Sequence, residues 1–285
     1  MVDKHLHIVS LDVPYPVDHG GIFDLFCKIV ALHKLSIKIH LHCFEYGRGV
    51  QDELNQYCEE VVYYKRKRGV KSFSLHLPYI VNSRRNDDLL INLLKDDYPV
   101  LLEGIHCTYL LYQNKLRNKK TFVRLHNVEF EYYRQLANST TSILKKTYFL
   151  IESKLLKKYE HNISSKATFI AVTLRDKEIY AREFRAIDIK YLPVFLPYNS
   201  VTAMEGKGSY CLYHGNLGIA ENEKAVLWLV KNVFNSLPVP FVIAGKNPSK
   251  KISGLAHQNA NICLIASPAD HEINELISKA HINIL

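Results

Sequence analysis

Short apolar runs alternate with helical patterns along the whole chain. Residues 37–44 alternate strictly between apolar and polar side chains, which predicts a strand with one buried face. Residues 22–35 instead repeat apolar side chains at helical spacing, which predicts a helix. Because strands and helices alternate in this way, we expect an α/β fold with parallel sheets covered by helices on both faces. The other expected strands are residues 6–11, 61–64, 100–103, 121–126, 168–172, 189–194, 210–214, 241–244, 262–264 and 282–285.

A polar stretch at residues 197–208 interrupts this pattern. It carries Pro, Asn, Ser and two Gly, a composition typical of a domain boundary. The sequence therefore predicts an N-terminal domain at residues 1–196 and a second domain at residues 197–285. Only the last four expected strands belong to the second domain, whereas a doubly wound sheet usually has five or six. We expect two doubly wound, Rossmann-like domains, the second of them incomplete in this chain.

Composition narrows the class of protein. The chain has 285 residues, of which 47% are hydrophobic and 23% charged, which excludes disordered and collagen-like proteins. No apolar run is long enough for a membrane span, and the first residues lack the features of a secretory signal. The six cysteines include no C-x-x-C pair, so we expect reduced thiols and a cytoplasmic protein.

The net charge of +9 indicates an anionic partner. A nucleic acid, a phosphorylated small molecule and a membrane surface all fit that charge. The helix expected at residues 143–159 carries five lysines beside an apolar stripe. The favoured interpretation is a surface helix packed on the sheet, and the alternative is a helix lying on an anionic membrane. No recognition-helix or stacking motif accompanies the basic run at residues 65–68, so we expect no nucleic-acid partner.

Polar and titratable residues follow several of the expected strands. Ligands of open α/β sheets bind beyond the carboxyl ends of the strands, where loops converge and helices begin. The loop after the first strand contains glycines that let the backbone approach a ligand. Histidines that follow two later strands, at the same edge of the sheet, can polarise a hydroxyl. An ordinary turn-rich loop and structural histidines are the alternative interpretation. In the first domain these candidates are Gly20, Gly21, Glu103, His106, His126, Asn127 and Glu129.

The second domain repeats this arrangement. Gly215 and Asn216 follow one strand, and Gly245 and Lys246 follow the next. A lysine in such a loop can neutralise a phosphate, although a solvated lysine in a turn is the alternative. The placement of both loops after strands predicts a nucleotide-phosphate site.

Two His-x-His pairs, at residues 5 and 7 and at residues 40 and 42, have a spacing that metals can use. No carboxylate or third histidine is tied to them by spacing, so packed or surface histidines are the favoured interpretation. We expect no metal and no other cofactor.

Several segments are similar to GT-B glycosyltransferases of the family 4 type, especially bacterial surface-polysaccharide enzymes. The start of that family resembles PYPVDHGGIFDLF and IKIHLHCFEYGR, and its acceptor-side loops resemble LLEGIHC and RLHNVEFEYY. The opening of its nucleotide-sugar domain resembles YHGNLGIAENEKAVLWLVKNV and FVIAGKNP. The resemblance runs nearly end to end.

This resemblance implies transfer of a sugar from a UDP- or GDP-linked donor to a hydroxyl of a glycan or lipid-linked acceptor. It implies retention of anomeric configuration, a role in polysaccharide biosynthesis and no metal, at a cytoplasmic location or on the inner face of the membrane. The catalytic candidate is His126, which contacts the transferred sugar or the acceptor hydroxyl. The resemblance places Glu103, His106, Asn127 and Glu129 on the acceptor side, and Gly20, Gly21, Gly215, Asn216, Gly245 and Lys246 on the donor side.

Two other functions stay open at this stage. The first is a non-catalytic relative that binds a nucleotide or glycan, since the family's distal donor segment is expected beyond residue 285. The second is a GT-B-like sugar-nucleotide epimerase, which releases products without an acceptor.

Overall fold

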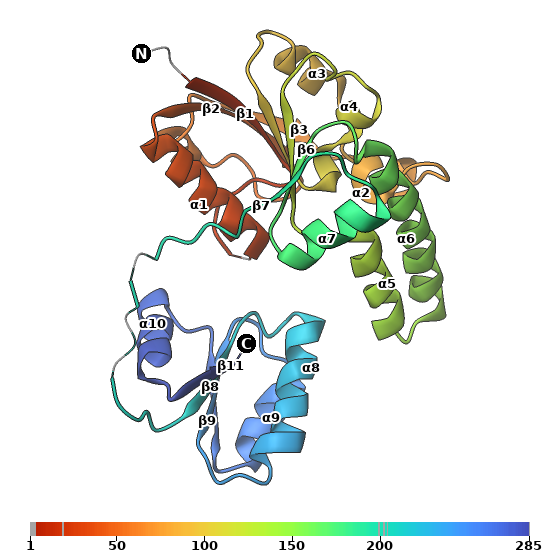
Figure 1. Ribbon diagram of the computed structural model, residues 1–285. Coiled ribbons are helices and arrows are strands. Elements are labelled where there is room, and N and C mark those ends of the chain that lie inside the picture. The colour runs from red at the N-terminus through yellow and green to blue at the C-terminus, as the bar shows by residue number, and fades with distance from the viewer. Residues whose placement is uncertain (1–3, 19, 199, 202, 204, 285) are drawn as a thin grey trace. The chain divides into compact units, whose positions relative to one another are not determined.

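The computed structural model describes residues 4–18, 20–198, 200–201, 203 and 205–284 (Figure 1). The chain divides into two compact units, Met1–Pro197 (unit 1) and Tyr198–Leu285 (unit 2). Each unit is built on a sheet of parallel strands with helices between them, which confirms the α/β class expected from the sequence.

The sheet of unit 1 has seven strands in the order β3-β2-β1-β4-β5-β6-β7. All neighbouring strands in it are parallel, so their carboxyl ends lie along one edge. The strands are β1 (Lys4–Ser10), β2 (Ile37–Glu45), β3 (Glu60–Lys65), β4 (Val100–Glu103), β5 (Thr121–Leu125), β6 (Thr168–Ala171) and β7 (Ile189–Tyr191).

The helices of unit 1 connect these strands. They are α1 (Gly20–Lys34), α2 (Tyr79–Asn82), α3 (Asp87–Leu93), α4 (Tyr109–Tyr112), α5 (Glu129–Ser139), α6 (Ile143–Ile163) and α7 (Leu174–Glu183), with short 3-10 turns at Asp52–Gln56, Val70–Ser72 and Ile105–Cys107.

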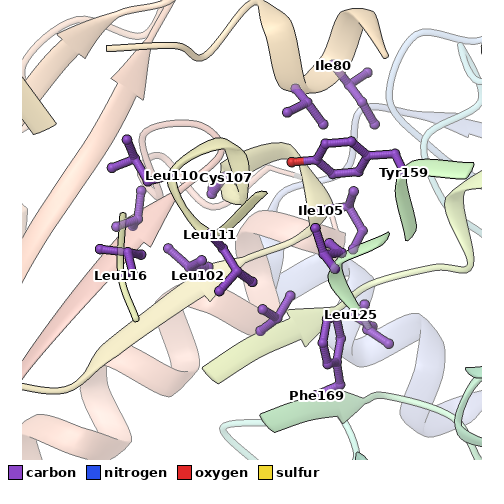
Figure 2. Packing of buried hydrophobic residues seen from close by; sticks show 14 of the residues in the cluster. Ile80, Leu102, Ile105, Cys107, Leu110, Leu111, Leu116, Leu125, Tyr159 and Phe169 are labelled. Carbon is purple, nitrogen blue, oxygen red and sulfur yellow. The ribbon is translucent and has the colours of Figure 1, made fainter. Parts of the chain in front are cut away.

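The largest apolar core of unit 1 lies around β4 and β5. Leu102, Leu125 and Phe169 come from three neighbouring strands, and Figure 2 shows them beside Ile105 and Leu111 of the following turns. All four residues of β4 are buried, as expected of a central parallel strand. This core fixes the loops that follow β4 and β5, where several candidate site residues stand.

Helix α6 differs from its expected packing. Residues Ile143 and Leu144 belong to the apolar stripe predicted to pack on the sheet, yet 80% and 85% of their surfaces are exposed. Further along the helix, Leu156, Tyr159 and Ile163 do belong to the core cluster that includes residues of the sheet. The buried face also includes two glutamates, Glu152 and Glu160, which accept hydrogen bonds from the first backbone N–H groups of α2 and α5. The helix packs against its neighbour α5, with which it forms a hairpin (Figure 1).

Strand β7 ends earlier than the sequence predicts, at Tyr191 rather than near residue 194. Pro193 has no N–H to donate to a neighbouring strand. The carbonyls of Leu192 and Pro193 accept hydrogen bonds from the Arg124 side chain instead, at 2.6 and 2.9 Å. A side chain of β5 thus takes the place of further strand pairing.

The four histidines of the His-x-His pairs face one another across β1 and β2. His5 Nδ1 lies 3.0 Å from His40 Nε2, and His7 Nδ1 lies 2.9 Å from His42 Nε2. The other ring nitrogen of His7 is 3.0 Å from an Asp96 carboxylate oxygen. Nitrogens of these rings are therefore engaged in contacts with one another and with the Asp96 carboxylate, which the sequence spacing did not connect to them.

Unit 2 has four described strands in the order β10-β9-β8-β11, all parallel. Its elements are β8 (Cys211–His214), α8 (Ala220–Leu229), a π-helical turn (Val230–Phe234), β9 (Phe241–Gly245), α9 (Lys250–Gln258), β10 (Ile262–Ala266), α10 (Asp270–Lys279) and β11 (Ile282–Ile284). None of the helices that the structure describes is both long and apolar enough to cross a membrane.

Candidate functional site

Glu103 and His126 meet at the carboxyl edge of unit 1. Glu103 is the last residue of β4, and His126 directly follows β5, the neighbouring strand. The Glu103 carboxylate Oε2 lies 3.1 Å from His126 Nε2. Glu103 is fully buried, whereas 16% of the His126 side chain is exposed. The glutamate therefore holds the imidazole from inside while the histidine reaches the surface.

The charge of Glu103 is maintained by its neighbours. Burial alone raises the pKa of Glu103, but the Lys28 ammonium 2.7 Å away and the His126 hydrogen bond outweigh it, so the pKa lies below its ordinary value. An ionised carboxylate only accepts hydrogen bonds. In the neutral form of the imidazole, His126 Nε2 therefore carries the hydrogen, and Nδ1 has the lone pair that can accept a hydrogen bond from a hydroxyl.

Lys28 and Glu103 belong to a larger buried ion network that the sequence analysis missed. Lys28 also lies 3.4 Å from Asp24, one turn earlier on α1, and Arg124 Nη2 lies 3.2 Å from Asp24. All four of these side chains are at least 96% buried. The network holds two carboxylates and two cations, so it is neutral as a whole, which offsets the cost of burying each charge.

Asp24 links this network to the end of unit 1. Its carboxylate accepts a hydrogen bond of 2.7 Å from the backbone N–H of Phe195. Burial alone raises the pKa of Asp24, but Lys28, this hydrogen bond and Arg124 lower it further than burial raises it. A charged residue within the apolar strand 121–125 was the sequence signal that could have revealed Arg124 and its partner.

Gly104 separates the two histidines of the site. Its φ is +76°, a conformation that L side chains rarely adopt. A Cβ on Gly104 would lie 2.9 Å from His106 Nδ1 and 3.5 Å from His126 Cδ2. The absence of a side chain at Gly104 thus allows both rings to stand at the edge together. Burial, with the charges of Arg84 and His126, lowers the pKa of His106 well below its ordinary value.

Asn127 and Glu129 follow His126 at the start of α5. Burial raises the pKa of Glu129 to about 7, against a hydrogen bond from Asn127 and the charge of Arg84, which both lower it. The Glu129 side chain is 3% exposed. The structure therefore brings Glu103, His106, His126, Asn127 and Glu129 together within unit 1, at the ends of β4 and β5.

Gly20 and Gly21 form the first turn of α1, one turn before Asp24. No described atom outside its chain neighbours and its own helix lies within 4 Å of a Cβ built on Gly20, so packing does not require a glycine there. The loop before α1 is held by Arg48, which donates to the Pro16 carbonyl at 2.8 Å and pairs with Asp12 at 3.1 Å. The predicted approach of a ligand to these glycines stays a prediction.

Among the described residues, one group has the side chains that commonly bind metal ions: Asp24, Glu103 and His126. One ligand atom from each lies within 4.8 Å of the others. The ammonium of Lys28 and the guanidinium of Arg124 already neutralise both carboxylates. A divalent cation there would stand beside two positive charges, so these residues do not favour one.

In unit 2 the loops after β8 and β9 pack directly against each other. A Cβ on Gly245 would lie 1.8 Å from the carbonyl oxygen of Gly215, so only glycine fits at residue 245. Leu217 N–H donates to the Lys246 carbonyl at 2.8 Å, and Gly218 N–H donates to Asn216 Oδ1 at 3.1 Å. The Gly215 backbone therefore occupies the position that a side chain at residue 245 would take.

The structure brings Gly215, Asn216, Gly245 and Lys246 together in unit 2 at the carboxyl edge of its sheet. Asn216 is half-buried, and its carbonyl accepts a hydrogen bond of 2.9 Å from Asn222 Nδ2 of α8. The Lys246 side chain is exposed, and among the described residues no carboxylate pairs with it. Its charge is therefore available at the loop surface.

The chain was compared with known protein families, sequences and structures. No known protein-family model matches the chain. A protein of Klebsiella pneumoniae, described as an uncharacterized 44.6 kDa protein in the cps region, is 28% identical over 290 residues, which cover 94% of this chain and 73% of that protein.

Three solved structures are similar over nearly the whole chain. TarM matches with a TM-score of 0.61 at 11% identity, covering 98% of this chain and 79% of TarM. Arabidopsis thaliana UGT89C1 complexed with UDP-L-rhamnose matches with a TM-score of 0.54 at 12% identity, covering 98% and 73%. MurG of Acinetobacter baumannii matches with a TM-score of 0.53 at 12% identity, covering 97% and 70%. The chain has the GT-B fold. Both Rossmann-like units are thus accounted for by an architecture found in glycosyltransferases.

Proposed function

We propose that this protein is a glycosyltransferase of the family 4 type that moves a sugar from a nucleotide-sugar to a hydroxyl of a glycan or lipid-linked acceptor. The observation that carries the proposal is the pair Glu103 and His126, joined at 3.1 Å at the carboxyl edge of a GT-B unit. The relative encoded in a cps region and the UDP-L-rhamnose complex of a structural neighbour support a role in polysaccharide biosynthesis with a nucleotide-sugar donor.

In this proposal His126 binds the reacting hydroxyl groups. Its Nε2–H is committed to Glu103, so Nδ1 accepts a hydrogen bond from a hydroxyl of the transferred sugar or of the acceptor. The acceptor oxygen attacks the anomeric carbon, and the bond from that carbon to the diphosphate breaks. With retention of configuration, the acceptor proton goes to the departing diphosphate.

Unit 2 binds the donor in this proposal. Lys246 and the backbone N–H groups of its loops stabilise the diphosphate as negative charge develops on it, which needs no covalent protein intermediate. Unit 1 correspondingly binds the acceptor beside Glu103, His106, Asn127 and Glu129. The proposed location is cytoplasmic, on or near the inner face of the membrane.

The test is calorimetric titration of the protein with UDP, GDP and ADP, together with the variant Lys246→Ala. We expect one nucleotide to bind saturably and Lys246→Ala to weaken it by about 1–3 kcal/mol, roughly 5- to 150-fold. Lys251→Ala, which removes an exposed lysine from α9, is the matched control and should bind normally.

Equal affinity of Lys246→Ala and the unaltered protein would remove Lys246 from the donor site, and failure of all three nucleotides to bind would contradict the donor role of unit 2. The nucleotide that binds is then supplied as its nucleotide-sugars. Release of the nucleoside diphosphate that depends on an added acceptor supports transfer. Release without an acceptor would favour an epimerase, and binding without release would favour a non-catalytic protein.

A further inference from the structure

Arginines gather at the carboxyl ends of β2 and β3, in the same unit as His126. Tyr46 directly follows β2, and its ring lies beneath three guanidinium groups. The guanidinium carbons of Arg66, Arg68 and Arg84 stand 4.5, 5.4 and 5.8 Å from the ring centroid. Three cations thus share one aromatic ring, which brings their positive charges close together.

Nothing in the described part of the chain neutralises these charges by an ion pair. Arg84 is 3% exposed, and its Nε and Nη1 donate to the carbonyls of Leu11 and Ile80 at 3.0 and 2.8 Å. Arg66 Nε donates to the Ser83 hydroxyl at 3.1 Å. Burial lowers the pKa of Arg84 to about 10, and the charge of Arg66 also lowers it. Buried arginines are normally paired with an anion, so this arrangement lacks one.

His106 extends the cluster toward His126. Its Nδ1 is buried and has no hydrogen-bond partner among the described residues. The charges of both Arg84 and Arg66 act on the ring, together with that of His126. A buried ring nitrogen without a partner carries a desolvation penalty, which an anion or its hydroxyl would remove. His106 therefore connects the arginines to the candidate catalytic histidine.

An apolar groove of about 420 Å³ lies close to the arginines. Phe73, Leu75, Tyr148 and Ile151 line it, and 54%, 86% and 51% of the surfaces of Phe73, Leu75 and Ile151 are exposed. The remaining titratable residue of the groove is Glu152, whose pKa burial raises to about 7. The Glu152 carboxyl is therefore protonated to a larger extent than an ordinary glutamate, which reduces the negative charge of the groove that would oppose an anion nearby.

Tyr79 joins the groove to the arginine cluster. Its ring centroid lies 5.9 Å from the Arg66 guanidinium carbon and 5.0 Å from the centroid of the Phe73 ring. Phe73 in turn lies 5.9 Å from the Tyr148 ring. A single molecule can therefore place a charged group beside Arg66 and an apolar chain along Phe73.

We propose that Arg66, Arg84 and His106 bind the phosphate of a lipid-linked acceptor, whose apolar chain lies in the groove formed by Phe73, Leu75, Tyr148 and Ile151. This inference rests on the proposed function, because it names the class of acceptor that the unit carrying His126 would take. The guanidinium fork suits the oxygens of a phosphate, and the stacking on Tyr46 fixes its orientation.

A lipid phosphate fits the surroundings of the cluster better than a free phosphate does. A free phosphate would use the arginines and leave the exposed apolar groove uncovered, although apolar patches of this kind mark binding surfaces. A neutral lipid would cover the groove and leave the buried charge of Arg84 unpaired. A molecule with both a phosphate and an alkyl chain satisfies both.

The test uses octyl phosphate below its micelle concentration, with inorganic phosphate and the neutral detergent octyl glucoside as comparison ligands, titrated into the full chain. We expect octyl phosphate to bind saturably and at least ten times more tightly than either comparison ligand. Arg66→Gln should weaken octyl phosphate at least tenfold and leave octyl glucoside unchanged. Arg182→Gln, which alters an exposed arginine of α7, is the matched control.

A second variant examines the apolar half of the site. Ile151→Ser should weaken octyl phosphate and leave inorganic phosphate unchanged, because it alters only the groove. Equal affinities for octyl phosphate and octyl glucoside would overturn the anion site. Equal affinities for octyl phosphate and inorganic phosphate would overturn the lipid acceptor and indicate a free phosphate.

Nucleotide binding to the same protein separates this inference from the proposed function. If UDP, GDP or ADP binds through Lys246 while octyl phosphate does not bind, the acceptor inference is wrong and the donor proposal stands. If octyl phosphate binds and no nucleotide does, the reverse holds. Arg66→Gln should also leave nucleotide affinity unchanged, since Arg66 belongs to unit 1 and the nucleotide loops to unit 2.

Discussion

Glu103 and His126 stand on neighbouring parallel strands, and a hydrogen bond of 3.1 Å joins them although 23 residues separate them in the sequence. The glutamate is buried and paired with Lys28, so its carboxylate is fixed in position and in charge. A histidine with one nitrogen fixed in this way presents the other as a defined acceptor. This pair is the basis of the first two predictions.

Replacement of His126 by alanine should abolish transfer and preserve the fold. The ring is partly exposed at the sheet edge, so its loss opens little space in the core, whereas removal of a positioned catalytic group typically lowers rates by about 10²- to 10⁴-fold. The measurement is acceptor-dependent release of nucleoside diphosphate, with circular dichroism as the check on folding. His33→Ala, at an exposed position of α1, should retain full activity. Normal turnover by His126→Ala would remove it from the site.

Replacement of Glu103 by glutamine should lower both activity and stability. The amide keeps the shape of the side chain but leaves Lys28 with one carboxylate instead of two, and breaking a buried ion pair typically costs about 3–5 kcal/mol. Chemical denaturation measures the stability, and we expect transfer to fall at least tenfold. Glu59→Gln provides the contrast, because its pair with Lys38 is exposed and should contribute less than about 1 kcal/mol.

Two glycine substitutions in unit 2 should change stability in opposite directions. A Cβ on Gly245 would overlap the Gly215 carbonyl, so Gly245→Ala must displace a loop and should destabilise the unit by about 3 kcal/mol or more. Gly254 lies within α9 with nothing within 4 Å of an added Cβ, so Gly254→Ala should stabilise the helix by about 0.5–1 kcal/mol. Thermal unfolding of both variants checks this, and equal midpoints would contradict the loop packing described for Gly215.

His42 should make stability decline toward acid pH. Burial lowers the pKa of His42 to about 3, with smaller effects of His7 and His40, while the unfolded histidine titrates near 6.5. As the pH falls from about 6.5 toward 3, the unfolded chain takes up a proton that the folded chain does not, which removes about 4–5 kcal/mol of stability. His42→Phe should flatten this slope in urea unfolding measured against pH. An unchanged slope would show that His42 protonates in the folded protein.

Glu129 should act in the opposite direction. Burial raises its pKa to about 7, so its contribution to stability is complete below about pH 4.5 and is lost as the pH rises through about 7. The loss is about 3 kcal/mol for this single group. Glu129→Gln should make the decline between pH 4.5 and 7 smaller by this amount, while the contribution of Glu152 remains. Glu178→Gln, which alters an exposed glutamate of α7, should show the same pH dependence as the unaltered protein.

The sequence predicted elements better than contacts. The strict alternation at residues 37–44 predicted the strand β2 correctly, but the expectation of one buried face was wrong: Leu41, His42, Cys43 and Phe44 are all buried, because both faces of this part of the sheet are covered. The helix at residues 143–159 also formed, but its predicted packing holds only in part: Tyr159 lies in the core, whereas Ile143 and Leu144 are exposed. The apolar stripe also did not show that Glu152 and Glu160 are buried and accept hydrogen bonds from the N–H groups of other helices. Such partners are distant in sequence and leave no periodic signal.

The candidate site shows the same limit. Position after a strand sufficed to single out Glu103 and His126, since the carboxyl ends of parallel strands share one edge. The sequence did not predict that Asp24 and Lys28 belong to the site, because charged residues four apart on a helix ordinarily face solvent. Their burial depends on the ion pair between Asp24 and Arg124, which lies on strand β5. The sequence also could not predict that Arg84 is buried without an ion-pair partner, since the partners of a side chain are set by the fold.

The segment that leaves unit 1 is anchored in the same ion network that supports His126. Asp24 accepts a hydrogen bond from the Phe195 N–H, and Arg124 donates hydrogen bonds to the carbonyls of Leu192 and Pro193. Asp24 also pairs with Lys28, which in turn pairs with Glu103. The backbone at residues 192–195 is therefore connected to the carboxylate that orients the imidazole through salt bridges and hydrogen bonds rather than through apolar packing alone.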